Sequence, residues 1–142
     1  MSVFNTLTTL ALDLIFPRTC VGCGADETLL CQSCQQSFII TPQILMLSGI
    51  AKTTVVTDYH QTIIQSAIKQ FKYHHLPQLA KPLATILVKA LELEPPLPLY
   101  HLLAVPLHQK RQRQRGYNQS ELLAKNIASY FQWPLLTGLS RV

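Results

Sequence analysis

The hydrophobic and polar positions of the N-terminal segment alternate with the period of a helix. Apolar side chains recur three or four positions apart in residues 1–16, at Val3, Leu7, Leu10 and Leu14. This spacing predicts an amphipathic helix. We expect its apolar face to pack on the protein itself, because its polar side lacks the basic residues of a helix that lies on a membrane surface.

The central part of the chain carries one strand pattern and two helix patterns. Residues 53–57 are β-branched throughout, which is typical of a strand. Asp58 and Gln61 then resemble a capping box, so a helix is predicted to begin there and to end before Pro77. A second helix is predicted over residues 79–93, and consecutive prolines after it begin a non-helical connector.

The last third of the chain predicts a βαβ unit. Residues 100–107 form a short apolar run, typical of a strand buried on both faces of a parallel sheet. A basic loop over residues 108–117 follows. Asn118 then caps a helix over residues 119–131, and a further strand begins within residues 135–139. The basic loop would thus lie at the carboxyl end of the first strand, where open α/β sheets bind ligands.

Composition excludes several classes of protein. The 142 residues are 48% hydrophobic and 13% charged, with a mean hydropathy of +0.19, which does not fit an intrinsically disordered chain. No stretch has the roughly 18 apolar residues that a membrane helix requires, so stable membrane insertion is not expected. Residues 1–16 contain no Lys or Arg and no small-residue cleavage site follows them, which argues against a signal peptide.

All four cysteines lie close together as two pairs, Cys20-x2-Cys23 and Cys31-x2-Cys34. Two such turns supply four converging sulfurs, the donor set of a closed tetrahedral Zn²⁺ site, so we expect a structural zinc ion in a small ribbon or knuckle. Two disulfides of a secreted domain and an iron–sulfur cluster are the alternatives. Reduced, metal-bound cysteines without a signal peptide favour the cytoplasm.

The basic loop is the second candidate site. Four of the twelve Lys and Arg residues lie between positions 110 and 115, and the net charge of the chain is +5. Charge alone fits a polyanionic partner and a solvated loop equally, although arginine suits bidentate contact with phosphate. The position of the loop, after a buried strand and before a capped helix, favours anion binding. The candidate phosphate- or nucleic-acid-binding residues are Lys110, Arg111, Arg113, Arg115, Gly116, Tyr117 and Asn118. Tyr117 has two interpretations, stacking on a base or packing at the start of the next helix, and the second is favoured.

These residues resemble the signature of the ComF family. The matching residues are Val105-Pro106-Leu107, Arg111 and Arg115-Gly116-Tyr117-Asn118-Gln119, and agreement extends along the chain. The resemblance implies an N-terminal zinc module joined to a type I phosphoribosyltransferase-like fold, and a role in competence, that is in DNA uptake or use of external DNA. It also implies that residues 108–119 match the loop on the pyrophosphate side of the site.

The chain also departs from the family pattern. Family members carry two adjacent acidic residues that hold phosphoribosyl pyrophosphate, whereas this sequence has no Asp-Asp pair. We therefore expect a C-terminally truncated member that is inactive alone as an enzyme, with phosphoribosyl pyrophosphate and Mg²⁺ as cofactors of the complete protein only. The expected fold class is α/β. Residues 1–40 would form the helix and zinc module, 41–52 a linker, and 53–142 the N-terminal part of an incomplete Rossmann-like parallel sheet with flanking helices.

Three functional interpretations follow. In the first, the zinc module and the basic loop bind single-stranded DNA or a DNA-uptake protein. In the second, the chain is a fragment of a phosphoribosyl-transferring enzyme that needs its missing half. In the third, it is an inactive remnant. An open sheet edge would in each case invite association with another chain.

Overall fold

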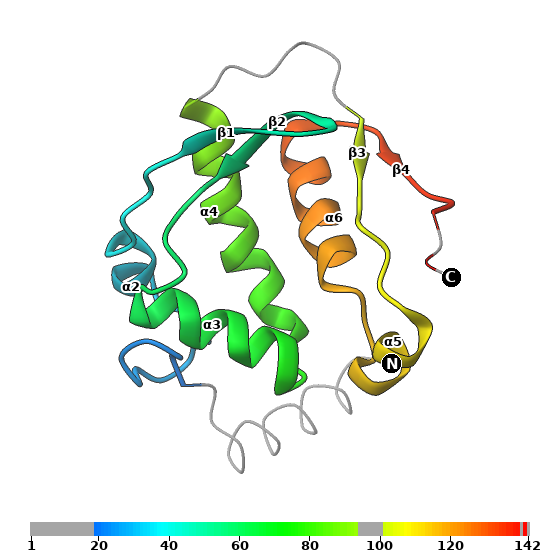
Figure 1. Cartoon of the computed structure of the whole chain (residues 1–142). Coiled ribbons are helices and arrows are strands. Elements are labelled where there is room, and N and C mark those ends of the chain that lie inside the picture. Colours follow the sequence, from blue (N-terminus) through cyan, green and yellow to red (C-terminus); the bar gives the residue numbers. More distant parts are fainter. Residues whose placement is uncertain (1–18, 94–100, 140, 142) are drawn as a thin grey trace.

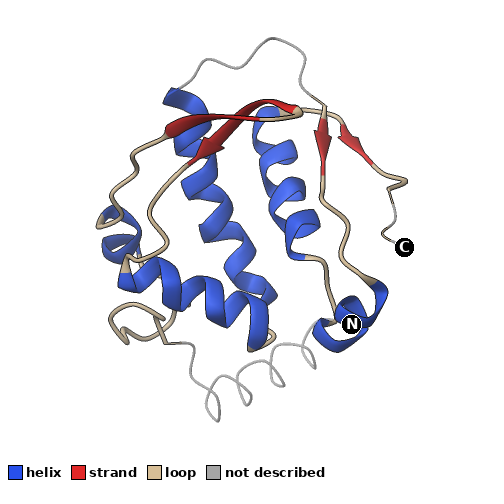
Figure 2. Cartoon of the chain, in the orientation of Figure 1, coloured by secondary structure: helices blue, strands red, loops and turns tan. Residues whose placement is uncertain are grey.

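The computed structural model describes residues 19–93, 101–139 and 141, and Figure 1 shows their arrangement. The helix predicted over residues 1–16 lies outside the described residues. The described elements, in chain order, are α2 Gln32–Gln36, β1 Gln43–Leu47, β2 Ile50–Val55, α3 Thr62–Tyr73, the 3₁₀ helix η1 Pro77–Leu79, α4 Ala80–Leu93, β3 Leu102–Leu103, α5 Gln109–Arg115, α6 Gln119–Phe131 and β4 Leu135–Leu136. Helices thus dominate, with short strands in two small sheets (Figure 2).

Helices α4 and α6 pack against each other in the middle of the molecule (Figure 1). Their contact buries Ala84, Val88 and Ile127. Helix α6 has the predicted range, and α4 begins one residue later than predicted. The side chain of Asn118 caps α6 by accepting a hydrogen bond from the N–H of Ser120 at 3.1 Å. The apolar periodicity of the sequence is sufficient to predict these two helices, because each buries one continuous apolar stripe.

Helix α3 ends at Tyr73, as expected, but the predicted capping box at its start is wrong. The helix begins after Gln61, whose side chain makes no capping bond. Asp58 instead accepts a hydrogen bond from the N–H of His60 at 2.8 Å, within a turn before the helix. The Gln61 amide bonds to both backbone groups of Ile39, at 3.1 and 3.0 Å, and so ties the start of α3 to the segment after the cysteines.

An antiparallel hairpin occupies the region expected to be a linker. Strand β1 pairs with β2 from Gln43 opposite Val55 to Leu47 opposite Ile50, with an irregularity after Leu45. The strand predicted over 53–57 therefore exists, but it begins and ends earlier, and the sequence pattern does not predict β1. Several apolar side chains of the hairpin are exposed: Ile44, Leu45, Met46 and Val55. Because Ile44, Leu45 and Met46 are consecutive and all exposed, β1 lacks the alternating pattern by which a half-buried strand is predicted from sequence. The domain boundaries at residues 40 and 52 stay a prediction.

Strands β3 and β4 are parallel, with Leu102 opposite Leu135 and Leu103 opposite Leu136. Helix α6 lies between them in the chain and contacts both, so a small βαβ unit is present. The larger parallel sheet expected from the sequence is not seen in the part of the chain that the structure describes, where this sheet has two strands. The prediction that residues 100–107 form a strand buried on both faces is also wrong, because Leu103 is 47% exposed and Val105 is 71% exposed.

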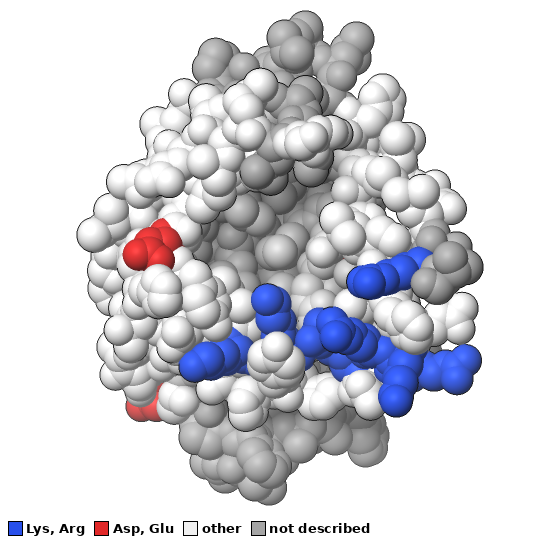
Figure 3. All heavy atoms as spheres, viewed as in Figure 1, with Lys and Arg blue, Asp and Glu red and all other residues white. Residues whose placement is uncertain are grey.

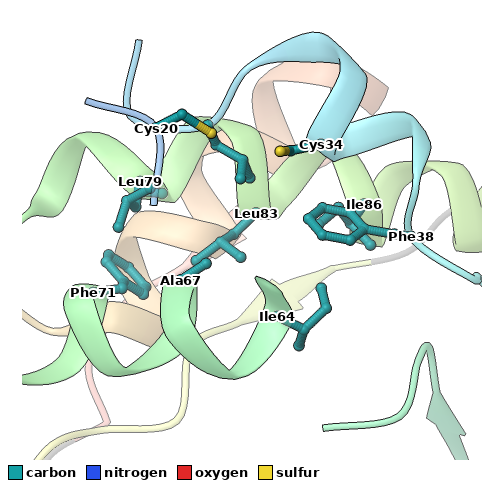
Figure 4. Packing of buried hydrophobic residues seen from close by; sticks show 11 residues of the cluster. Cys20, Cys34, Phe38, Ile64, Ala67, Phe71, Leu79, Leu83 and Ile86 are labelled. Atoms are coloured by element: carbon teal, nitrogen blue, oxygen red, sulfur yellow. The ribbon is translucent and has the colours of Figure 1, made fainter. Parts of the chain in front are cut away.

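The cysteine segment and the helices share one hydrophobic core. Figure 4 shows Phe38 and Cys34 facing side chains of α3 and α4, among them Ile64, Leu83 and Ile86. Full burial of an aliphatic or aromatic side chain contributes about 1.5–3 kcal/mol, so this shared cluster is a main source of stability. The cysteine segment consequently packs against α3 and α4 through this core.

Candidate functional site

The first candidate site is the metal centre formed by the four cysteines. The N–H of Gly24 donates to the carbonyl of Cys20 at 2.8 Å, which closes the first Cys-x2-Cys turn. The N–H of Val21 donates to the carbonyl of Leu29 at 3.0 Å, which folds the chain back. Helix α2 begins directly after Cys31, so Cys34 lies within its first residues. Local backbone bonds thus bring the two pairs together.

The sulfur positions fit a single tetrahedral ion. The four Sγ atoms lie within 4.8 Å of one another, with Cys20 to Cys31 at 3.6 Å and Cys23 to Cys31 at 3.5 Å. Thiolates at about 2.3 Å from a tetrahedral zinc are about 3.8 Å apart, whereas a disulfide would place two sulfurs at about 2.05 Å. All four described cysteines are free thiols. The arrangement therefore supports a structural zinc ion, with the four sulfurs leaving no open coordination position.

The surroundings of the sulfurs stabilise the thiolate form at some of the cysteines and oppose it at another. Hydrogen bonding with the Ser33 hydroxyl lowers the pKa of Cys31 to about 6, and backbone hydrogen bonding at Cys34 adds to this effect. Burial opposes ionisation of Cys20, but hydrogen bonds from the backbone at Cys31, Cys23 and Gly22 leave its pKa lowered. Burial and the neighbouring cysteines raise the pKa of Cys34 to about 12. A bound cation would have to displace the Cys34 proton.

Gly22 is required for space. A Cβ atom built at this position would lie 2.8 Å from the Sγ of Cys34 and 2.9 Å from Cγ2 of Ile63. Ordinary contacts between carbon atoms are about 3.5–4.0 Å, so no larger residue fits without displacement. Gly22 therefore lets the turn of the first pair approach the second pair closely.

The second candidate site is the basic segment, which forms helix α5 rather than the predicted loop. Gln, Lys and Arg are good helix formers, and Arg113 and Arg115 lie in the last turn, where a positive charge opposes the helix dipole. The side chain of His108 caps the start by accepting from the N–H of Lys110 at 3.2 Å. Gly116 ends the helix with a φ of +80°, a conformation that glycine adopts without strain.

A hollow of about 370 Å³ lies between α5 and the end of α3. Its lining residues are Lys72, Tyr73, His75, Arg111, Gln114 and Arg115. Figure 3 shows the Lys and Arg side chains forming a band over these two elements, with the acidic residues on that face lying apart from it. The two elements are tied together, because the carbonyl of Arg115 lies 3.1 Å from Nδ1 of His75 and the Arg115 guanidinium lies 5.6 Å from the centre of the Tyr73 ring.

The structure divides the predicted phosphate-binding residues into three groups. Arg111 and Arg115 line the hollow, whereas Lys110 and Arg113 are exposed on α5 outside it. Gly116, Tyr117 and Asn118 have structural roles at the ends of α5 and α6. The hollow also contains residues that were not predicted: Lys72, Tyr73, His75 and Gln114. Only the packing of α3 beside α5 brings them to Arg111 and Arg115.

Tyr117 and Asn118 hold α6 in place. The hydroxyl of Tyr117 donates to the carbonyl of Phe71, and the two rings stack with centroids 5.7 Å apart. Burial raises the pKa of Tyr117, and the charge of Arg115 opposes this rise. The amide of Asn118 caps α6 and also donates to the carbonyl of Val105 at 3.2 Å. Packing, the favoured interpretation of Tyr117, is therefore what the structure shows.

A second hollow, of about 350 Å³, lies beyond the carboxyl ends of β3 and β4. Its lining includes Leu103, Gln112, Asn118, Gly138 and Arg141. This is the position at which ligands bind in parallel sheets. The sequence predicted a site here, and the structure places Asn118 alone of the predicted phosphate-binding residues on its wall.

Residues 11–44 match the family model of the double zinc ribbon domain. The whole chain has four cysteines, which supply the thiolates of one tetrahedral site. No curated protein and no solved structure matches the chain. Among the described helices, none is both long enough and apolar enough to cross a membrane.

Proposed function

We propose that this chain is a ComF-like, zinc-stabilised cytoplasmic protein that binds the phosphates of single-stranded DNA at the hollow between α3 and α5, and that it acts in DNA uptake or use. The observation that carries the proposal is the gathering of Lys72, Arg111 and Arg115 around one concavity that no described acidic residue lines. In this proposal the zinc site has a structural role, because it holds α3 in place through the shared core.

The electrostatics of the hollow favour a polyanion. Three cations of like sign around one concavity repel one another, and phosphate oxygens relieve that repulsion while accepting several hydrogen bonds from each guanidinium. For a single strand that contacts three cations, the salt slope is roughly −0.7 × 3, or about −2. Affinity would then fall about 20-fold between 50 and 200 mM salt. A DNA-uptake protein with an acidic surface is the other partner that this charge fits.

The test is fluorescence anisotropy with a labelled dT12 oligonucleotide and the zinc-loaded chain at 50 and 200 mM salt. The double variant Arg111→Ala plus Arg115→Ala is expected to weaken binding at least about tenfold and to flatten the salt slope by about 1.4. The control is Lys89→Ala plus Lys125→Ala, which removes the same charge from exposed positions outside the hollow. Equal losses in the two double variants would contradict a defined site, and so would the absence of oligonucleotide binding.

Phosphoribosyl transfer is a second candidate, supported by the parallel pairing of β3 and β4 and by the hollow at their carboxyl ends. This activity would also need an Asp-Asp pair, which these 142 residues do not contain. Isothermal titration with phosphoribosyl pyrophosphate and Mg²⁺ separates this candidate from the first, because a small pyrophosphate has a shallower salt dependence than an oligonucleotide. Binding of neither ligand would leave the inactive remnant as the interpretation.

A further inference from the structure

We infer that Tyr73 is a base-stacking residue of the hollow between α3 and α5, so that the site reads unpaired bases as well as phosphate charge. This inference rests on the proposed function, because it concerns the same site and adds the part of the ligand that the cations do not contact. Single-stranded nucleic acid is bound by combining a basic groove with aromatic side chains, since every base has a π face.

Tyr73 is available for such a contact. Its side chain is 67% exposed although it is a large aromatic residue in the wall of a concavity. The guanidinium of Arg115 lies over the ring at 5.6 Å, in the range of a cation–π contact. A ring has two faces, and the exposure of Tyr73 leaves area beyond the contact with Arg115. A base on that area would extend a stack of base, ring and guanidinium.

The position of Tyr73 relative to the cations fits a nucleotide. Lys72 precedes it on α3, and Arg111 and Arg115 line the same hollow from α5. The volume of about 370 Å³ is within the range of ligand pockets, roughly 300–1,000 Å³. His75 and Gln114 add polar groups to the same wall and can hydrogen-bond to a base edge.

The backbone segments that carry Tyr73 and Arg115 are joined to each other without any ligand. The carbonyl of Arg115 contacts the ring of His75 at 3.1 Å, and the hydroxyl of Tyr117 bonds to the carbonyl of Phe71. Both contacts join the end of α3 to the residues at the end of α5. Little backbone rearrangement would therefore be needed when a base stacks on the Tyr73 ring.

The experiment compares dT12 with an abasic 12-mer that has the same phosphates and no bases. Both are titrated into the zinc-loaded full chain by anisotropy at 50 mM salt. The variants are Tyr73→Ala, Tyr73→Trp and, as a matched surface tyrosine outside the hollow, Tyr59→Ala. Base–aromatic stacking corresponds to roughly 5- to 150-fold in affinity per base. The wild type is thus expected to prefer dT12 over the abasic strand by at least about fivefold.

Tyr73→Ala should remove this preference while leaving abasic binding within about twofold of the wild type, and Tyr73→Trp should retain it. Tyr59→Ala should change neither strand. Equal weakening of both strands by Tyr73→Ala would show that Tyr73 only holds α5, and unchanged affinity for both strands would show that it contacts no base. Either result overturns the inference while the phosphate-binding proposal stands. Absence of binding to both strands by the wild type would overturn the two together.

Discussion

Replacing Gly22 with alanine is expected to damage the metal centre through space rather than through charge. The added methyl would lie 2.8 Å from the Cys34 sulfur and 2.9 Å from Cγ2 of Ile63, about 0.6–1.2 Å inside normal contact. Overpacking of this kind costs about 1–3 kcal/mol. Because the Cys34 sulfur is one of the two groups that must move, we expect zinc affinity to fall together with stability.

Gly24→Ala is the matched control. Gly24 has a φ of +76°, and nothing lies within 4 Å of a Cβ built there, so alanine adds backbone strain of about 1–2 kcal/mol without pressing on a ligand. Zinc affinity is measured by competition with a chromogenic chelator, and stability by thermal unfolding of the zinc-loaded chains. Zinc affinity of Gly22→Ala no weaker than that of Gly24→Ala would refute the steric reasoning.

Four further outcomes are expected. Removal of zinc by a chelator should expose the amides of α3 and α4 to hydrogen exchange along with those of the cysteine segment, whereas loss confined to residues 19–40 would contradict the shared core. Tyr117→Phe should lower stability by about 1 kcal/mol, since it removes the bond to the Phe71 carbonyl, and unchanged thermal unfolding would count against that bond. Asn118→Ala should cost about 1 kcal/mol through the lost cap of α6, or about 2–5 °C in the melting temperature, and Asn118→Ser should restore part of it. Zinc binding should weaken as the pH falls and should release protons at neutral pH, because burial raises the Cys34 pKa to about 12; calorimetry in buffers of different ionisation enthalpy measures this release, and buffer-independent heats would contradict it.

The sequence predicts those parts of the fold in which local pattern and tertiary packing agree. Helices α4 and α6 have regular apolar stripes and clear ends, and both form where expected. Helix α5 escapes prediction because its basic and amide side chains have no apolar periodicity, although their intrinsic helix propensity is high. Strand β1 escapes it because Ile44, Leu45 and Met46 follow one another directly, so the sequence shows no alternation of apolar and polar positions there.

The metal centre is predictable and the basic hollow is only partly so. Four cysteines in two short pairs determine their own geometry, because local turns bring them together. The hollow combines Lys72 and Tyr73 with Arg111 and Arg115, which come from two segments far apart in the sequence. No local pattern encodes that meeting, which depends on how α3 packs beside α5.

Cys20 and Cys34 supply sulfur atoms to the candidate metal centre and also belong to the hydrophobic core, since they are only 3% and 5% exposed. A newly made chain without its ion would hold two polar thiols at the centre of its apolar interior, one of which resists ionisation. We therefore expect metal binding to accompany folding, so that chains made without zinc would reach the folded state less completely.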